Sequence, residues 1–585
     1  MKKVICTLLA LVMVMSMMVG CGSKEETTTE APAKEETSAP AEEKKEEAPA
    51  EEKKEEAPTE WTEEGYLPFA NGETLVIGTS ELAVVDNYDT NPMTVWLEEQ
   101  TGVNIEFMFF PGDAGAKQQT FTLMVAAGEK LPDIIMNGVE LTTQMINEYG
   151  RDGYIVDLKD YIGDMNYTPY MTQALNKISD ALHTSIMIKI TDPTTGGIYQ
   201  APWASDVVAW DNTQTIGWIN QKWLDAVGMK APTTIDELHD VLVAFKEKDP
   251  NGNGKADELP MMGNNGSGGA HMLGYVINPY VYFDFNNHFN ATDGQVWAPW
   301  ASDEYREALK TLNAWYQEGL IAQQCFTGID NQDAKAILTP EDEVAICGVM
   351  CGHPSVYMTK GNAAYLEYVP LETIWNAETD KGGYQVNRPG AVYDGSIITA
   401  DCENVELALR FLDFFYKDST VATVRHGYQG THWEWVDPAE TNPNVKNVKV
   451  IKNVYDYERR FNWGYNFAIS TSNNFMNAVP REGWDGYKDE CETQIETWMS
   501  TAKVPDEVVV NFVFTPEEQE FYNSNVQLFT DYINESMAKF GTGVWDPGDD
   551  AAWETYLGEL KAMGMEEYLA TAQSGYSKYL EKYGK

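Results

Sequence analysis

Between residues 74 and 136 the sequence alternates short apolar runs with helical patterns, and this alternation constrains the fold more than any other feature. The runs at 74–78, 103–110 and 131–136 have the length of buried strands, and residues 93–100 and 121–128 have helical spacing. Strands that alternate with helices form a parallel sheet covered by helices. The sequence therefore predicts an α/β fold.

Helical patterns dominate the rest of the chain. Thr234 and Glu237 have the spacing of a capping box, which predicts a helix running to about residue 248. Two more helices are expected at 303–318 and 405–417, and most of the last hundred residues have helical spacing. The C-terminal part is therefore expected to be rich in helix.

The chain begins with a pattern typical of export. Lys2 and Lys3 precede an apolar run at 4–19, which is short for a membrane span but fits a signal peptide. The stretch Met18-Val19-Gly20-Cys21 resembles a bacterial lipobox, in which the cysteine carries lipid and becomes the new N-terminus. The alternative is an ordinary signal peptide with an incidental cysteine. The expected location is the extracellular face of the cytoplasmic membrane, with lipidation at Cys21.

The composition of residues 21–60 predicts a disordered acidic tether. Glu, Lys, Thr, Ala and Pro make up nearly all of it, and residues 41–49 repeat at 50–58 as AEEKKEEAP. No residue of these types fills a core, so the segment cannot offset its own ordering entropy. The folded body should begin near Trp61.

The charge of the chain excludes one class of partner. The formal net charge is −50 and most of it lies beyond residue 60, with no cluster of Lys or Arg. Such a body repels DNA and RNA, so nucleic-acid binding is not expected.

The cysteines indicate no disulfide framework of the kind found in small secreted domains, because the five beyond the lipobox are scattered and odd in number. Cys347 and Cys351 with His353 have a metal-like spacing but lack a second ligand pair. Free buried thiols, one disulfide and a zinc site all remain open. The five cysteines are Cys325, Cys347, Cys351, Cys402 and Cys491.

A calcium loop is predicted directly after the helix that starts near Thr234. Oxygen-bearing side chains fall at positions 1, 3, 5 and 9 of the run that begins at Asp249, with Gly254 at the sharp turn. Pro260 stands where an EF-hand has its glutamate, and Glu258 can supply the bidentate carboxylate instead. The alternative is a polar turn. The expected Ca²⁺ ligands are Asp249, Asn251, Asn253, Asp257 and Glu258 with the carbonyl of Lys255.

The order of segments resembles the large extracellular solute-binding proteins of carbohydrate ABC importers, in a branch that includes alginate-oligosaccharide binders with such a calcium loop. The resemblance covers essentially all of the body. It rests on GWINQKWLDAVG at 217–228 followed by APTTIDEL and the loop, on FTLMVAAGEKLPDIIM at 121–136, and on the blocks at 148–160, 304–321, 406–417, 425–433 and 515–579.

The resemblance implies a two-lobed, periplasmic-binding-protein-like fold of type II, whose lobes are joined by hinge crossovers and close on the ligand. It assigns the first lobe to residues 61–205 and 395–440. The second lobe then comprises 206–394 and 441–585, with the C-terminal helices.

The resemblance also nominates ligand-binding residues in loops that follow strands and at the crossovers. Trp223 and Trp315 lie in helical patterns and are expected in the core, whereas Trp297 and Trp300 are left open. The nominated residues are Asp86, Asn87, Tyr88, Asn137, Glu140, Trp203, His353, Arg388, His432 and Trp433.

The implied function is a monomeric receptor, not an enzyme, that delivers a neutral oligosaccharide to ABC permease subunits. Family ligand preferences need not transfer, because Asn220-Gln221-Lys222 stands where the family commonly has Arg-Lys-Asp. An exported glycoside hydrolase is the main alternative, since 91 acidic residues leave room for a catalytic carboxyl pair. A receptor for peptides or other solutes on the same fold is a third reading.

Overall fold

The structure is a computed structural model, and its residues fall into two units, 1–60 and 61–585. The predicted signal peptide, Cys21, the tether and Cys491 lie outside the described residues. No helix in the part that the structure describes is long and apolar enough to cross a membrane. The described residues are 63, 66–82, 85–136, 139–205, 216–263, 272–284, 288–329, 331–338, 343–351, 354–358, 363–384, 390–435, 448–451, 463, 468–470, 503 and 505–584.

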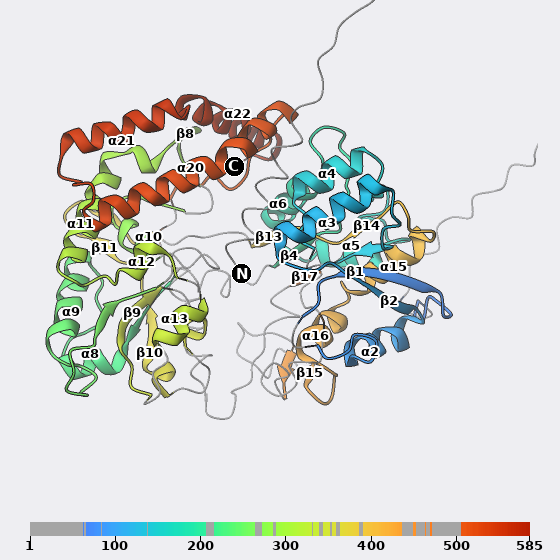
Figure 1. Ribbon diagram of the computed structural model, residues 1–585, viewed down its shortest axis with the longest axis horizontal. Coiled ribbons are helices and arrows are strands. Elements are labelled where there is room, and N and C mark those ends of the chain that lie inside the picture. Colours follow the sequence, from blue (N-terminus) through green and yellow to red (C-terminus); the bar gives the residue numbers. More distant parts are fainter. Residues whose placement is uncertain are drawn as a thin grey trace, which may run out of the picture. The chain divides into compact units, whose positions relative to one another are not determined.

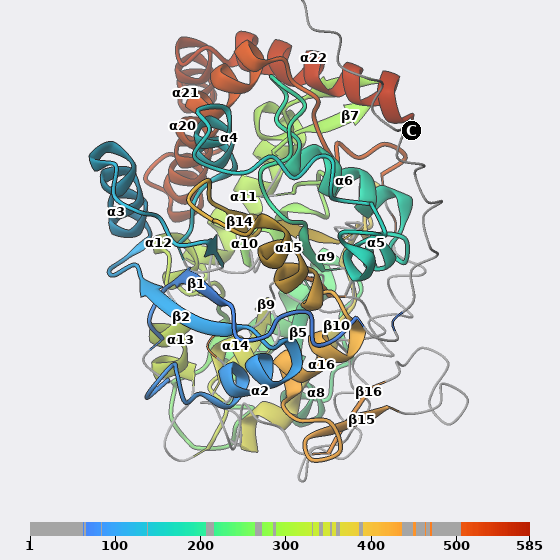
Figure 2. The same cartoon turned by 90° about the vertical axis from the view of Figure 1, so that its right-hand side faces the viewer.

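The first lobe is built on a four-stranded sheet in the order β14-β3-β1-β2. Its strands are β1 (Thr74–Thr79), β2 (Asn104–Phe109), β3 (Ile134–Ile135) and β14 (Ile397–Ile398). β1 runs parallel to β2 and β3, and Figure 2 shows β1 and β2 side by side. β14 pairs antiparallel with β3, so the predicted parallel sheet is wrong at this edge. The reason is that β14 arrives from a distant part of the chain and closes the sheet in the opposite direction.

Helices follow the strands of the first lobe, as the alternation predicted. They are α2 (Pro92–Thr101), α3 (Ala114–Ala127), α4 (Thr143–Arg151), α5 (Pro169–Leu175), α6 (Asp180–Ile190), α15 (Val405–Phe414) and α16 (Asp418–His426), with the hairpin β15 (Trp433–Trp435) and β16 (Val448–Val450). α2 ends at Gly102, whose φ is 77°. A Cβ there would lie 2.1 Å from the carbonyl oxygen of Ala70, so this position needs glycine for conformation and for space.

The core of the first lobe extends further along the chain than the predicted boundary at residue 440. Trp463, Ala468 and Ile469 are buried among side chains of β1, α2 and α15. The indole Nε1 of Trp463 donates to Thr94 Oγ1 at 2.8 Å. The assignment of the stretch around Trp463 and Ile469 to the second lobe is therefore corrected, because these apolar side chains complete the first core, whereas α20 (Pro516–Thr542), α21 (Asp550–Ala562) and α22 (Met565–Tyr583) pack in the second core as expected.

The second lobe has its own sheet, in the order β10-β5-β9-β6. β6 runs parallel to β9, whereas β5 is antiparallel to both of its neighbours, so this sheet is mixed. Its strands are β5 (Gly217–Asn220), β6 (Leu259–Met261), β9 (Cys347–Cys351) and β10 (Tyr368–Leu371), and the lobe also has the short pairs β7 (Asn290–Thr292) with β8 (Gln295–Trp297) and β11 (Trp375–Asn376) with β12 (Lys381–Gly382).

Helices pack on the second sheet and continue into the C-terminal part, where α20, α21 and α22 lie together as predicted (Figure 1). The capping box at the start of α9 is confirmed, since Thr234 Oγ1 accepts from Glu237 N at 3.2 Å and the Glu237 carboxylate accepts from Thr234 N. The helices are α8 (Gln221–Val227), α9 (Ile235–Glu247), α10 (Met272–Ile277), η1 (Pro299–Ala301), α11 (Asp303–Gln317), α12 (Gln324–Thr327), α13 (Asn331–Leu338), α14 (Pro354–Tyr357), η2 (Ala363–Glu367), α20 (Pro516–Thr542), α21 (Asp550–Ala562) and α22 (Met565–Tyr583).

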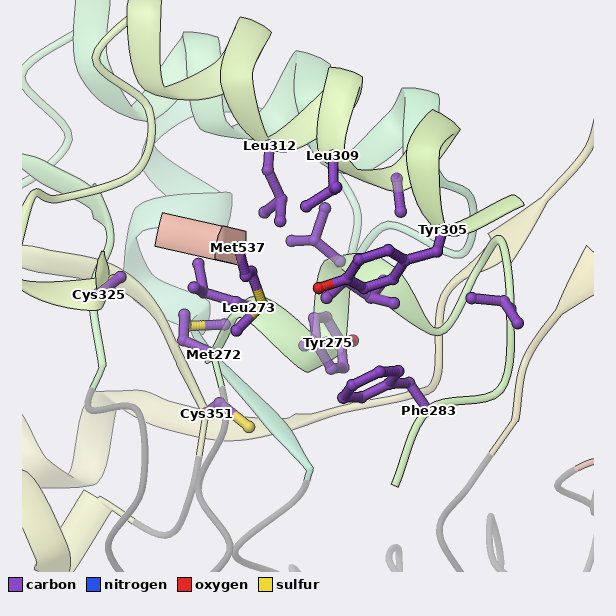
Figure 3. Close-up of a cluster of buried hydrophobic side chains, with 14 of the residues drawn as sticks. Met272, Leu273, Tyr275, Phe283, Tyr305, Leu309, Leu312, Cys325, Cys351 and Met537 are labelled. Carbon is purple, nitrogen blue, oxygen red and sulfur yellow. The ribbon is translucent and has the colours of Figure 1, made fainter. Parts of the chain in front are cut away.

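Aromatic and aliphatic side chains from these helices form the second core. Figure 3 shows Tyr305 over Phe283, whose rings stack with centroids 5.6 Å apart, beside Leu309 and Leu312 of α11. Trp223 and Trp315 are buried, which confirms the prediction that they are core residues. Trp300 is also buried, while Trp297 packs against the core only in part.

Three strands from distant parts of the chain form the crossover sheet, in the order β13-β4-β17. β4 (Trp203–Ser205) precedes the entry into the second lobe at β5, and β13 (Ala391–Tyr393) follows the return from it. β17 (Ile469–Ser470) pairs parallel with β4, and β13 pairs antiparallel with it. Ala204 and Ile469 are buried in the first core, so this sheet is built into the first lobe.

Glu63 and residues 66–70, just before β1, are held on the first lobe, and we call them the N-terminal strap. Lys417 Nζ lies 2.6 Å from the Glu63 carboxylate, and the Tyr170 hydroxyl donates to the same carboxylate at 3.2 Å. The hydrogen bond from Lys417 is the main reason why the pKa of Glu63 lies below its usual value. Tyr66 packs edge-on against Tyr170, with ring centroids 5.5 Å apart.

Asp413 of α15 joins the strap to α5. Its fully buried carboxylate accepts from Tyr170 N at 3.2 Å, from Met171 N at 2.8 Å and from the Tyr66 hydroxyl at 3.2 Å. α5 has no side-chain cap of its own at Thr168, so Asp413 supplies the cap from another helix. Burial raises the pKa of Asp413 to about 7, although these three hydrogen bonds oppose the shift.

We predict that stability depends on pH through Asp413. The folded chain holds a proton there up to about pH 7, whereas the unfolded chain releases it near its ordinary pKa. The protonated Asp413 side chain therefore contributes to the unfolding free energy at pH values below the pKa of the unfolded chain. This contribution is lost as pH rises through the pKa of the folded chain. Asp413→Asn should flatten the fall in unfolding free energy between about pH 4 and about pH 7, measured by urea denaturation at a series of pH values.

Asp413→Ala should cost about 1–3 kcal/mol at any pH in this range, because two buried N–H groups lose their acceptor. Asp418→Asn is the matched control, since its carboxylate is 37% exposed and pairs with Lys177 at the surface. An unchanged pH slope in Asp413→Asn would contradict the assignment of the proton to this carboxyl.

Candidate functional site

Trp203 lies on the crossover sheet, where the chain passes from the first lobe to the second. Its side chain is half-buried, and Tyr393 of β13 stands directly opposite with ring centroids 4.5 Å apart. Tyr393 was not nominated from the sequence, because nothing in the run AVYDG marks it as the partner of a residue almost two hundred positions away. Trp203 therefore lies at the crossover, as the resemblance predicted, and its contact with a solute stays a prediction.

The loop after β1 holds three nominated residues in two different environments. Asp86 and Asn87 are exposed, whereas Tyr88 is buried between the rings of Phe107 and Phe109. The Tyr88 hydroxyl accepts from Leu82 N at 2.7 Å and donates to the carbonyl of Ser80 at 3.0 Å. Tyr88 thus shapes the loop that carries its two exposed neighbours, and its contact with a solute stays a prediction.

Glu140 lies in the loop after β3 and has a left-handed backbone, with φ of 59°. Lys117 Nζ of α3 lies 2.9 Å from its carboxylate, and the Gln118 amide donates to its carbonyl at 2.6 Å. These contacts fix the loop against α3, while half of the Glu140 side chain stays exposed. Non-glycine residues in this region of backbone space concentrate at functional sites.

His432, in the turn before β15, and Trp433, the first residue of β15, are both buried. Tyr428 N donates to Nδ1 of His432 at 2.8 Å, and the indole of Trp433 donates to the carbonyl of Gly427 at 2.7 Å. The ring of Trp433 is fully buried with Ala422 and Val448. The structure gives both side chains a packing role, and their contact with a solute stays a prediction.

Three nominated residues fall outside the described residues, and the structure gives no account of them. They are Asn137, His353 and Arg388.

The predicted calcium loop is a tight turn between α9 and β6. Asp249 and Gly254 have left-handed backbones, with φ of 44° and 73°. The Asp249 carboxylate accepts from Asn253 N at 3.2 Å and from Gly254 N at 3.0 Å, so the chain wraps round its first residue. The side-chain amide of Asn253 donates to Asp257 at 3.0 Å, which brings position 9 of the loop back toward position 5.

The donor set of the loop fits a divalent cation. Glu258 Oε1 is buried and has no hydrogen-bond partner among the described residues. Burial raises the pKa of Glu258, and the carboxylates of Asp249 and Asp257 add to the shift by repulsion. The described ranges contain no group of three His, Cys, Asp or Glu side chains placed to bind a metal ion. The side chains of Asn251 and Asn253 and the carbonyl of Lys255 would therefore have to complete the set of calcium ligands.

Four of the five cysteines beyond the lipobox are described, and all four are buried thiols that are not joined in a disulfide. They are Cys325, Cys347, Cys351 and Cys402. Cys347 Sγ donates to the carbonyl of Val349 at 3.3 Å, and burial raises the pKa of the Cys325 thiol to about 12. Thiols with a raised pKa are poor nucleophiles and poor metal ligands, so the reading as free buried thiols fits these residues best.

The comparison with protein families decides the class. Bacterial extracellular solute-binding proteins match residues 71–422, more than half of the chain, from β1 through the crossover sheet to α16. The chain belongs to this family.

Among relatives of this solute-binding protein is the fructooligosaccharide ABC transporter substrate-binding protein FusA of Streptococcus pneumoniae serotype 4. It is 23% identical over 516 residues, which cover 83% of this chain and 86% of FusA. Lipoprotein LipO of Bacillus subtilis is 26% identical over 249 residues, which cover 43% of this chain and 45% of LipO.

Solved structures of similar proteins support the fold. An HMO-binding, ABC-transporter-associated solute-binding protein from Bifidobacterium longum infantis has a TM-score of 0.67 at 20% identity, covering 87% of this chain and 99% of its own. An EF-hand mutant of FusA in complex with fructo-nystose also scores 0.67 at 22% identity, covering 87% of this chain and 100% of FusA. The predicted solute-binding-protein fold is thereby confirmed.

The family also separates the functional alternatives. The family is one of solute-binding proteins, and FusA is named as a substrate-binding protein of an ABC transporter, so this chain is a receptor and not an enzyme, and the glycoside hydrolase reading loses its support.

Proposed function

We propose that this chain is the extracellular receptor of an ABC importer and captures a neutral oligosaccharide by closure of its two lobes. The observation that carries the proposal is the similarity to FusA along 83% of the chain, since FusA is named for fructooligosaccharides. A sugar site combines aromatic surface with a few polar groups. The crossover sheet carries the aromatic rings of Trp203 and Tyr393, and the loop after β1 carries the exposed polar residues Asp86 and Asn87. The partner would be the permease subunits, and the receptor would act as a monomer.

The charge of the chain supports a neutral solute. At a net charge of −50, a uronate-containing oligosaccharide would be repelled at long range unless the site were locally basic. In the described part of the first lobe, Lys117 and Lys189 are both paired with carboxylates, which leaves little positive charge from them for an acidic sugar.

Titration of the purified chain by tryptophan fluorescence tests this function. The panel is kestose, fructo-nystose and maltotriose as neutral oligosaccharides, trigalacturonate as an acidic one, and a tripeptide. We expect saturable binding of at least one neutral oligosaccharide and none of trigalacturonate or the peptide. The bound oligosaccharide should be recovered intact after overnight incubation, because a receptor leaves the glycosidic bond unbroken.

Binding of trigalacturonate alone would overturn the neutral preference. Binding of the peptide alone would favour the third reading of the sequence, and shortened sugar products would favour a hydrolase.

Lipidation of Cys21 would keep this receptor at the membrane. The lipobox-like sequence and the similarity to a lipoprotein, LipO, support the proposal. In a bacterial host, Cys21→Ser should leave the precursor uncut and should abolish labelling with a radioactive fatty acid. Ser38→Ala, in the tether, is the control and should be processed and labelled normally. Unchanged cleavage of Cys21→Ser would instead indicate an ordinary signal peptide.

Calcium would bind the loop 249–258 and stabilise the second lobe. Glu258, Asp249, Asp257, Asn251 and Asn253 would hold the ion with the Lys255 carbonyl, and the ion would relieve the repulsion among the three carboxylates. The structure of a FusA variant described as an EF-hand mutant supports the presence of such a loop among relatives.

We predict that calcium raises the unfolding free energy by about 2.7 kcal/mol when its concentration is 100 times the dissociation constant. Equilibrium dialysis should find one ion per chain. In Glu258→Gln, calcium should no longer raise the unfolding free energy. In EGTA the unfolding free energy of this variant should be no lower than that of the unaltered chain, because the neutral side chain removes a buried like charge. Glu247→Gln, exposed at the end of α9, is the control. Less than half an ion per chain would contradict the proposal.

A further inference from the structure

Two side-chain hydrogen bonds cross from the second lobe to the first, apart from the crossover sheet. Asn511 Nδ2 donates to Ser185 Oγ of α6 at 2.8 Å, and Asn523 Nδ2 of α20 donates to Gln144 Oε1 of α4 at 3.5 Å. The partners are 326 and 379 positions apart in the chain. We call these four residues the interlobe contact.

Asn511 is fixed to the second lobe by the segment around it. Val509 is buried in the second core, and Val513 N donates to the carbonyl of Gly575 in α22 at 3.0 Å. A Cβ on Gly575 would lie 2.3 Å from the ring of Phe514, so this segment and α22 are in direct contact. Asn511 must therefore move with the second lobe.

Ser185 lies beside the crossover strands of the first lobe. It comes one turn after Leu182, which is buried in the first core. A Cβ on Gly390, just before β13, would lie 2.9 Å from the Leu182 side chain and 2.4 Å from the carbonyl oxygen of Ser205 in β4. α6 thus packs on both crossovers. The Ser185 hydroxyl donates to the carbonyl of Ala181 at 3.0 Å, which leaves its lone pairs to accept from outside α6.

Gln144 lies at the edge of the first sheet where the parallel strands end. α4 follows the loop after β3, and β3 runs parallel to β1. Open α/β sheets bind ligands outside the carboxyl ends of such strands. A hydrogen bond from Gln144 to α20 therefore spans the side on which a solute would enter.

Both members of this outer pair are oriented by their own helices. Gln144 Nε2 donates to Glu148 Oε1 at 2.9 Å, one turn along α4. Asn523 Oδ1 accepts from Gln519 Nε2 at 2.8 Å, one turn back along α20. Each side chain thus has an internal partner on one of its polar atoms and presents the other to the opposite lobe.

The four side chains of the interlobe contact are uncharged. The chain has a formal net charge of −50, so a contact that brought further carboxylates together would be opposed by repulsion. Amide and hydroxyl groups avoid this repulsion, and salt does not screen their hydrogen bonds as it screens an exposed ion pair. The contact is therefore suited to a strongly acidic chain.

We infer that the interlobe contact is a latch that holds the lobes in the closed arrangement, so that Asn511 and Asn523 slow the release of a solute that they do not touch. This inference rests on the proposed function and adds to it the residues that set how long the solute stays. Displacement in a rotation grows with distance from the hinge. Opening would therefore separate Gln144 from Asn523 more than Ser185, beside the crossovers, from Asn511.

The rate of solute release tests the latch, measured by stopped-flow tryptophan fluorescence. The probe is the neutral oligosaccharide of the titration panel that the unaltered chain binds most tightly. We expect Asn523→Ala to raise the dissociation rate about threefold and Asn511→Ala/Asn523→Ala about tenfold, since each variant removes hydrogen bonds that hold the lobes together. The association rate should change by less than about twofold, because most changes in affinity between related complexes lie in the dissociation rate.

Asn525→Ala is the matched control. Asn525 is half-buried on the same helix as Asn523, but its side-chain amide donates to the carbonyl of Phe521 within α20 at 2.8 Å. Its dissociation rate should stay within about twofold of that of the unaltered chain. A dissociation rate of Asn511→Ala/Asn523→Ala that equals that of Asn525→Ala would overturn the latch, even if the double variant unfolded at a lower temperature.

A conservative variant and a double-mutant cycle keep the test informative if the alanine variants fold poorly. Asn523→Asp can still accept from Gln519 but cannot donate to Gln144, so it should release the solute as fast as Asn523→Ala. Ser185→Ala/Asn511→Ala should release it no faster than Asn511→Ala alone, because the two side chains act through one hydrogen bond. Additive effects would contradict the pairing.

Small-angle X-ray scattering of the solute-free chain separates failure of the latch from failure of the proposed function. The radius of gyration of Asn511→Ala/Asn523→Ala should exceed that of the unaltered chain and of Asn525→Ala, because the lobes open. If no oligosaccharide of the panel binds the unaltered chain, the proposed function is overturned while a larger radius still supports the latch. Equal radii in that case would overturn the latch as well.

Discussion

The pairing of β4 with β13 and β17 is the interaction on which the rest of the structure depends. It joins residues 203–205 to 391–393 and 469–470, so it gathers three points that are far apart along the chain. Each lobe has a sheet and a core of its own, and the crossover sheet belongs to the first of these cores. Without this pairing the chain would have no defined path between its two lobes.

Buried polar groups reinforce this arrangement at places where the backbone would otherwise lack partners. Asp413 replaces the missing side-chain cap of α5, and fully buried Asp192 accepts from Arg151 and from the backbone of its own turn. A buried carboxylate is costly unless its oxygens find donors, so each of these residues specifies one arrangement of neighbouring segments. Glu258 is different, since one of its oxygens has no donor in the described structure, and that difference is why a cation is proposed at its loop.

Local sequence patterns predicted the elements well and the long-range pairing less well. The strand at β1, the capping box of α9 and the end of α2 at Gly102 follow from neighbouring residues alone, because caps and turns are decided within a few positions. The antiparallel edge strand β14, the mixed second sheet and the burial of Trp463 in the first core depend on segments hundreds of residues apart. No local pattern carries that information.

The same limit applies to the candidate site. Trp203 could be nominated because its position near a crossover follows from the family resemblance, whereas Tyr393 becomes visible only when its strand is paired. Tyr88 and Trp433 lie in the expected loops, yet their hydroxyl and indole groups are used by the backbone beside them. A loop position alone does not distinguish a side chain that meets solute from one that shapes the loop.

The N-terminal strap has a mechanical consequence. Glu63 and Tyr66 are tied to Lys417 and Asp413, so the chain enters the folded body through the first lobe. A load that reaches Glu63 and Tyr66 would pass into α15 and α5 and would not have to cross the strands β4 and β13. A pull on Glu63 would therefore be borne by the first lobe, through one ion pair and one buried carboxyl, and would leave the crossover strands unloaded.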